Sequence, residues 1–359
     1  MKKNISLISV LSGFAILVAG SLIISSCEGP QGPPGLDGTN GVDGINGVDG
    51  KDANETCIIC HNADVVLYAK EQQASSSMHT SGDTYARNHA DCAICHTHQG
   101  FVETLESGDL EASADIEDPA PINCRTCHNI HETYTEADWA LVTYDAVDTD
   151  FGDFTIDIGG NSNLCVNCHQ FRPVDPMPVV GGGDVSITSS RWGPHHGPQG
   201  NVLYGVGGYE VAGSKNYPAP GSAAHASIGC TYCHMGAMPY NTPEVGGHTF
   251  NVAVDGEDGN TYVCETCHID IEENDFDYNG LQSEIDDLLS QLETIFVARG
   301  IIDEPGDLWN ASSGTPLVVS ADEAGAMLNY DMIEQDRSHG VHNPFYTVAL
   351  LTNTVESLQ

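Results

Sequence analysis

Six copies of the pentapeptide Cys-x-x-Cys-His constrain this chain of 359 residues more than any other feature. The copies begin at Cys57, Cys92, Cys124, Cys165, Cys230 and Cys264, and they use twelve of the thirteen cysteines. Two thiols three positions apart, with a histidine directly after the second, form the attachment signature of a c-type haem. The thiols add to the vinyl groups of the porphyrin, and the imidazole becomes the proximal ligand of the iron.

We therefore predict six covalently bound haem c groups. Their thioethers would come from the cysteine pairs Cys57 and Cys60, Cys92 and Cys95, Cys124 and Cys127, Cys165 and Cys168, Cys230 and Cys233, and Cys264 and Cys267. Their proximal ligands would be His61, His96, His128, His169, His234 and His268. Structural zinc and disulfides also use paired cysteines. Neither needs a histidine after the second cysteine, and with 16 histidines in the chain six such coincidences are negligible.

The remaining cysteine lies at the end of a predicted export signal, residues 1–27. Lys2 and Lys3 precede an apolar stretch over residues 5–24, and Ser25 and Ser26 lead into Cys27. A positive start, an apolar stretch and small residues before a cleavage site are typical of exported proteins. A cysteine at the cleavage point resembles a bacterial lipoprotein signal, with Cys27 acylated. The alternative is an uncleaved membrane anchor, since about 20 apolar residues can span a bilayer.

A spacer with a collagen-like repeat is predicted over residues 28–52. Glycine occupies every third position from Gly29 to Gly50, the period that a collagen triple helix requires. The run is short, and its prolines, Pro30, Pro33 and Pro34, all lie near its start. We therefore favour a flexible spacer over a trimerising stem. Either form holds the rest of the chain away from the membrane, by up to roughly 70 Å in a polyproline-like conformation.

The remainder divides into a six-haem domain, residues 53–278, and a C-terminal helical part, residues 279–359. The first is rich in Gly, Pro, Asn and polar turns, so we expect a mostly α and irregular fold with stacked haems and sparse secondary structure. In the second, apolar residues follow helical spacing from Leu281 to Phe296. Ser320 with Glu323 predicts a capped second helix, and Pro344 predicts the start of a third. These helices should pack on the haem domain.

Distal iron ligands should come from the ten histidines outside the motifs. The set that we predict is His79, His131, His196, His225, His248 and His342. His131 lies too close to His128 to cross the same porphyrin, so it should serve a neighbouring haem. His195 and His196 are adjacent and only one should ligate. The sequence hardly distinguishes them, and His89, His98 and His339 are left as the other spare histidines.

Charge narrows the range of partners. The chain has 51 acidic and 11 basic residues, a formal net charge of −40. Such a surface repels nucleic acid and anionic membranes, and it steers basic proteins or metal cations. Simple solubility, or life in a salty habitat, explains the charge equally well. We expect redox proteins or extracellular acceptors as partners, a lipid membrane through Cys27, no nucleic acid, and a trimer or filament as a further possibility.

Several stretches resemble known haem proteins. They are Cys-His-Thr-His-Gln-Gly-Phe (95–101), Cys-Arg-Thr-Cys-His-Asn-Ile-His (124–131), Gly-Pro-His-His-Gly-Pro-Gln-Gly-Asn (193–201), Gly-Gly-His-Thr-Phe (246–250) and Asp-Arg-Ser-His-Gly-Val-His-Asn-Pro (336–344). The first four resemble exported bacterial multihaem cytochromes used in long-range electron transfer. The last is similar to the C-terminal region of the superfamily that includes cytochrome c nitrite reductase and hydroxylamine oxidoreductase. That resemblance implies that His342 is a distal ligand and His339 is not.

Two functions from different classes follow. The first is a hexahaem lipoprotein that carries electrons across or outside the cell envelope. In a variant of this function, copies of the chain assemble into a filament, and one subunit donates an iron ligand to the next. The second is an oxidoreductase that reduces nitrite or oxidises hydroxylamine at one open haem. Nitrite reductases of the similar family use Cys-x-x-Cys-Lys at the substrate haem, and this chain has none. We therefore favour the carrier, without catalytic residues, anchored at the outer membrane or cell surface rather than at the inner membrane.

Replacement of Cys27 with serine tests the lipid anchor. A serine cannot carry the thioether-linked lipid, so Cys27→Ser should leave the membrane fraction while keeping its haem content. Fractionation with a haem stain measures both. A variant that stays in the membrane would favour the uncleaved anchor instead.

Overall fold

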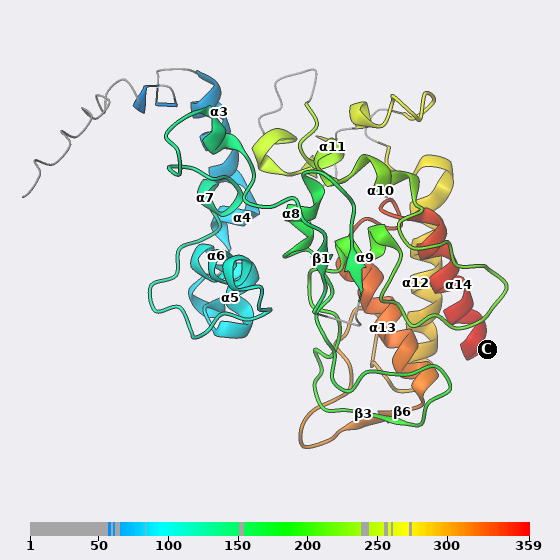
Figure 1. Ribbon diagram of the computed structural model, residues 1–359. Coiled ribbons are helices and arrows are strands. Elements are labelled where there is room, and N and C mark those ends of the chain that lie inside the picture. Colours follow the sequence, from blue (N-terminus) through cyan, green and yellow to red (C-terminus); the bar gives the residue numbers. More distant parts are fainter. Residues whose placement is uncertain are drawn as a thin grey trace, which may run out of the picture. The chain divides into compact units, whose positions relative to one another are not determined.

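The computed structural model describes residues 57–58, 60–61, 65–82, 84–150, 154–237, 244–254, 258–259, 261–272 and 275–359. Residues 51–359 form a single compact unit. The predicted signal, the acylated Cys27 and the repeat over residues 28–52 lie outside the described residues. Figure 1 gives the course of the chain.

Short helices and turns make up most of the part that carries the motifs (Figure 1). Its α-helices are α3 (Val65–Ser76), α4 (Met78–Ser81), α5 (Ala90–His96), α6 (His98–Ser107), α7 (Cys124–Cys127), α8 (Ser162–Val166), α9 (Gln199–Tyr204), α10 (Ala224–Ile228) and α11 (Cys230–His234). Its 3-10 turns are η1 (Tyr85–Arg87), η2 (Glu136–Trp139), η3 (Gly247–Thr249), η4 (Thr261–Val263) and η5 (Tyr278–Gly280). This agrees with the expected helical and irregular fold.

Sheet is limited to short antiparallel pairs in the described residues. Strand β1 (Val147–Asp148) pairs with β2 (Thr155–Ile156), and β4 (Ala253–Val254) pairs with β5 (Asp258–Gly259). Strand β3 (Val185–Ile187) pairs with β6 (Leu317–Val319), with Ser186 opposite Val318. The last pair joins the middle of the chain to its C-terminal part.

Three long helices form the C-terminal part, as predicted. They are α12 (Leu281–Ala298), α13 (Ala321–Asp336) and α14 (Pro344–Leu358), and α14 packs against both others (Figure 1). The capping box of α13 is confirmed: the Ser320 hydroxyl accepts from the Glu323 backbone, and the Glu323 carboxylate accepts from the Ser320 backbone. Pro344 occupies the first turn of α14, where a missing N–H costs no helical hydrogen bond.

The main apolar core lies among these three helices and residues 171–211. Phe296, Met327, Leu328 and Leu350 are completely buried in it. From the middle of the chain it takes Phe171, Ile187, Trp192, Val202 and Tyr209. The C-terminal helices therefore pack on the segment that follows the fourth motif, and they give that segment a rigid base.

The part around the first three motifs has few buried apolar side chains. Between residues 57 and 165 the described residues contribute only Ala93, Phe101, Ala112, Val147, Ile156 and Leu164. Burial of apolar area supplies most of the free energy of folding, so this part needs another apolar group at its centre.

Within the described residues, no helix has both the length and the apolar character needed to cross a membrane.

Asn329 joins the core helices to the middle of the chain, and its removal should destabilise the fold. Its amide, fully buried on α13, accepts from the Tyr209 backbone N–H at 2.7 Å and donates to the Tyr209 carbonyl at 2.9 Å. Asn329→Ala would leave both backbone groups buried without partners, so we expect a loss of about 3 kcal/mol in the free energy of unfolding. Denaturation followed by far-UV circular dichroism measures it.

Asn310 provides the matched control. Its exposed amide also donates to a backbone carbonyl, that of Gly300, at 3.1 Å. Water can replace that bond, so Asn310→Ala should cost less than about 1 kcal/mol. Equal losses in the two variants would contradict the role assigned to Asn329.

Candidate haem sites

Each Cys-x-x-Cys-His motif forms a single helical turn. In four motifs the histidine backbone N–H donates to the carbonyl of the first cysteine at 2.7–2.9 Å. The other two, which begin at Cys92 and Cys230, lie inside helices α5 and α11. Residues three and four positions apart share one face of a helical turn. Both thiols and the imidazole of each motif therefore face the same side, as attachment to one porphyrin requires.

None of the twelve motif cysteines forms a disulfide. We number the sites from 1 to 6 in the order of their motifs, so that site 1 contains His61 and site 6 contains His268. Among the described residues, no three His, Cys, Asp or Glu side chains gather in the manner of a metal-ion site.

Every motif histidine faces one histidine from outside the motifs, at nearly constant separation. The distances between ring centres are 6.2 Å for His61–His131 (site 1), 6.3 Å for His96–His195 (site 2), 6.3 Å for His128–His248 (site 3), 6.0 Å for His169–His79 (site 4), 6.2 Å for His234–His342 (site 5) and 6.1 Å for His268–His225 (site 6). Rings this far apart do not touch each other. The six pairs thus repeat one geometry with histidines from unrelated positions in the chain.

This separation fits a metal ion bound on both faces. With metal–nitrogen bonds of about 2.0 Å on each side, the centres of two opposed imidazoles lie about 6 Å apart. The pairs fall into two groups by the angle between their ring planes. Sites 1, 3 and 5 have angles of 39°, 31° and 36°, whereas sites 2, 4 and 6 have angles of 73°, 82° and 74°. The residues present therefore fit six haems, each between two imidazoles.

Hydrogen bonds at Nδ1 orient five of the paired histidines. The acceptors are the Trp139 carbonyl for His128 at 2.7 Å, Gln199 Oε1 for His169 at 3.0 Å, the Val341 carbonyl for His225 at 2.5 Å, the Phe250 carbonyl for His234 at 2.9 Å and Asp336 Oδ1 for His342 at 2.6 Å. A histidine that donates from Nδ1 presents the lone pair of Nε2 to a metal. These contacts are typical of the groups that hold metal-bound histidines in place.

Burial keeps several of these imidazoles neutral, the form that binds metals. Burial and then the charge of His169 lower the pKa of His79 to about 4. Burial and the nearby His196 lower the pKa of His195 to about 4 as well. At His342 burial acts in the same direction, but the charge and hydrogen bond of Asp336 outweigh it and raise the pKa.

Five of the six predicted distal histidines lie opposite a motif histidine: His79, His131, His225, His248 and His342. The sixth place, opposite His96, is taken by His195 and not by the predicted His196. His195 has a left-handed backbone (φ 67°), and His196 turns away to Gln335, with which its Nδ1 forms a hydrogen bond. Gln335 lies on α13, 139 residues away, so no local signal separates the two histidines.

The other spare histidines have partners of their own. His89 contacts Asp115 at 2.9 Å, His98 contacts the Thr126 hydroxyl at 3.0 Å, and His339 contacts Asp286 at 2.6 Å. Each contact is made through Nδ1, and none of the three faces a motif histidine.

Contacts between motifs give the order of the sites. Cys95 of site 2 donates its thiol to the Cys168 carbonyl of site 4 at 3.9 Å, and Cys168 donates to the Ile94 carbonyl at 3.7 Å. Between sites 4 and 5, the Cys230 backbone N–H donates at 2.9 Å to the hydroxyl of Ser162, which lies on the same helix as Cys165. Helices α8 and α11, which carry these two cysteines, pack together (Figure 1).

Sites 5 and 6 are also adjacent, as are sites 3 and 4. Tyr232 of motif 5 donates to the Thr266 hydroxyl of motif 6 at 3.2 Å. Between sites 3 and 4, the Phe250 ring contacts both His248 of site 3 and His79 of site 4. Site 4 therefore has three neighbours, sites 2, 3 and 5, and site 6 lies beyond site 5.

Phe250 joins three sites. Its ring contacts His79 of site 4 at 4.7 Å and His248 of site 3 at 5.9 Å, measured between ring centres. Its carbonyl accepts from His234 of site 5. One residue after η3 thus positions ligand candidates at sites 3, 4 and 5.

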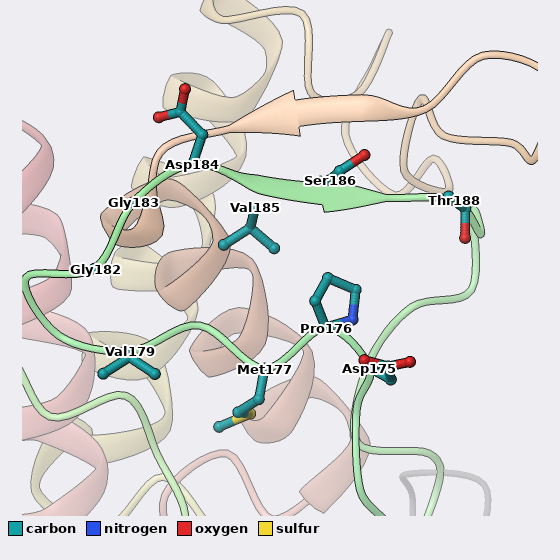
Figure 2. Close-up of a pocket in the computed structure, with 10 residues that line it drawn as sticks. All are labelled: Asp175, Pro176, Met177, Val179, Gly182, Gly183, Asp184, Val185, Ser186 and Thr188. Atoms are coloured by element: carbon teal, nitrogen blue, oxygen red, sulfur yellow. The ribbon is translucent and has the colours of Figure 1, made fainter.

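A separate pocket of about 570 Å³ lies beside β3 (Figure 2). Asp175, Pro176, Met177 and Asp184 are among its lining residues, and no histidine or cysteine lines it. It is separate from the six sites.

No protein-family model and no curated protein matches this chain. Two solved structures are similar in fold. The crystal structure of the outer cell wall cytochrome OcwA has a TM-score of 0.48 and 18% identity, over 81% of this chain and 50% of that one. The undecahaem cytochrome from the S-layer of Carboxydothermus ferrireducens has a TM-score of 0.44 and 18% identity, over 80% of this chain and 40% of that one. This chain spans half or less of their lengths.

The two adjacent histidines provide a matched pair of variants. His195→Ala should convert one haem to the high-spin form without detaching it, since Cys92, Cys95 and His96 are unchanged. His196→Ala should leave all haems low-spin, because its ring contacts Gln335 and not His96. Electron paramagnetic resonance of the oxidised proteins measures the difference. The opposite result would restore His196 as the ligand.

Proposed function

We propose that this chain is a hexahaem c-type cytochrome that relays electrons. Twelve thioethers and six motif histidines would attach the haems, and His131, His195, His248, His79, His342 and His225 would be the distal ligands of sites 1 to 6. The haem supplies reversible one-electron chemistry at the iron. The single observation that carries the proposal is the set of six imidazole pairs, separated by 6.0–6.3 Å.

Relay is favoured over catalysis because both faces of every site have a histidine. An enzyme that reduces nitrite or oxidises hydroxylamine needs one open position on the iron. Each motif histidine has its partner across the gap, so such an enzyme would have to displace one of the six distal candidates. Orienting hydrogen bonds hold His225 and His342 in place against such a displacement.

The contacts between motifs support a branched path. Sites 1, 3, 4, 5 and 6 form a line. His131 of site 1 follows His128 of site 3 by three residues, Phe250 contacts histidines of sites 3 and 4, and hydrogen bonds join site 4 to site 5 and site 5 to site 6. Site 2 joins this line at site 4 through Cys95 and Cys168. A line with a branch offers three ends at which a donor or acceptor can dock. This arrangement suits a connector between other redox carriers.

The remaining sequence features extend this proposal to location. We infer a lipid anchor at Cys27, a spacer over residues 28–52, and, outside the cytoplasm, a six-haem domain over residues 53–278 with the C-terminal helical part, residues 279–359, packed on it. The net charge of −40 favours basic redox proteins or cationic acceptors as partners. Anchor and spacer together would hold the haems away from the membrane surface, within reach of such partners.

Haem stoichiometry and spin state test the proposal together. The intact mass of the purified protein should include six haems, and the oxidised protein should be low-spin throughout, because two imidazoles complete the ligand field of each iron. Its low-spin signals should fall into two classes of three, since ligand-plane angles of 31–39° and of 73–82° split the iron orbitals differently. The reduced protein should bind little carbon monoxide.

Two results would contradict the proposal. Three or fewer haems in the mass, or bound zinc, would refute the haem assignment itself. A native high-spin population of about one haem in six, together with turnover of nitrite or hydroxylamine, would favour the enzyme.

A further inference from the structure

Site 5 differs from sites 3, 4 and 6 in the charge of a group that orients one of its histidines. Four of the five orienting acceptors are neutral: the carbonyls of Trp139, Val341 and Phe250, and the amide oxygen of Gln199. The fifth, at His342, is the Asp336 carboxylate. The inference from this difference rests on the haem binding proposed above.

The Asp336 carboxylate is buried and is held in place by hydrogen bonds to both of its oxygens. Its side chain is 0% exposed, and Oδ1 lies 2.6 Å from His342 Nδ1. Oδ2 accepts from the Ser338 hydroxyl, whose oxygen in turn accepts from the His342 backbone N–H at 3.1 Å. The carboxylate ends helix α13, which the main core holds rigidly. Both the position and the direction of the hydrogen bond to His342 are therefore fixed.

We propose that Asp336 is a positioning residue that makes the iron of site 5 the hardest to reduce among the four sites with a described orienting contact, sites 3, 4, 5 and 6. A carboxylate draws the Nδ1 proton of a bound imidazole toward itself and increases the basicity of that imidazole. A more basic ligand, with a buried negative charge nearby, stabilises the ferric iron over the ferrous iron. Neutral acceptors at the other three sites do this far less.

The place of site 5 gives this difference a consequence for the relay. Site 5 lies between site 4, where the path branches, and site 6, where it ends. The same loop that carries Asp336 and His342 also orients His225 of site 6 through the Val341 carbonyl. A low potential at site 5 would make the reduced form of that haem unfavourable. Electrons passing between site 6 and the other haems would then cross site 5 without remaining there.

Replacement of Asp336 with asparagine is the sharpest test. Asparagine has the same shape and keeps an oxygen that can accept from His342, but it lacks the charge. In the full-length holoprotein, Asp336→Asn should move one low-potential step of the redox titration to a more positive value and shift one low-spin resonance signal. Five steps should stay unchanged, with all six haems present in the mass. Asp336→Glu, which keeps the charge, should recover part of the shift.

Asp286→Asn is the matched control. Asp286 accepts from His339 Nδ1 at 2.6 Å, the same pairing as at His342, but His339 faces no motif histidine. This variant should leave all six potentials unchanged. An unchanged titration for Asp336→Asn, or an equal shift for both variants, would overturn the proposal.

A second variant keeps the test decisive if Asp336→Asn fails to hold its haem. Ser338→Ala keeps Asp336 and His342 and removes the hydroxyl that donates to Oδ2, so the carboxylate should accept more strongly from His342. The site 5 step should then move to a more negative value, and no movement would overturn the proposal. Failure of this inference can be told apart from failure of the proposed function. If the proposed function is wrong, the intact mass of the unaltered protein will already include fewer than six haems.

Discussion

The opposition of two imidazoles across a gap of about 6 Å is the constraint on which the rest of this structure depends. It recurs six times, and each time it joins a motif histidine to one from another part of the chain. Site 4 connects His169 to His79, 90 residues before it in the numbering. Such pairs act as crosslinks once a metal lies between them. In the proposed holoprotein, the haems between these pairs would supply the apolar groups that the region around the first three motifs lacks.

The apolar core that does exist lies where it can position the later sites. Helices α12 to α14 pack on residues 171–211, and this base carries the loop from Asp336 to Asn343. Asn343 is buried, caps α14 through the Tyr346 backbone and donates to the Leu203 carbonyl. The loop is thereby tied at both ends. Its histidine at 342 reaches site 5, and its carbonyl at 341 reaches site 6.

The sequence predicts helix positions and helix caps well, because residues close together in the chain determine them. The helix that begins at Leu281, the capping box at Ser320 and the start of α14 at Pro344 all follow from spacing and residue type. The pairing of histidines does not. His131 faces His61 and His248 faces His128, across distances that no periodicity encodes. His196 contacts Gln335, a residue of a distant helix, and His195 has a left-handed backbone, so the positions of the two rings could not be separated from sequence.

Phe250 contacts histidines of three sites at once. Phe250 contacts His79 and His248 with its ring, and its carbonyl orients His234. A left-handed backbone at this residue (φ 60°) directs the ring and the carbonyl to different neighbours. Phe250 thus links sites 3, 4 and 5, in addition to the separate contacts that each site has with Trp139, Gln199 or Asp336. Histidine pairs that share a supporting residue keep fixed separations, as the proposed relay between neighbouring metal centres would require.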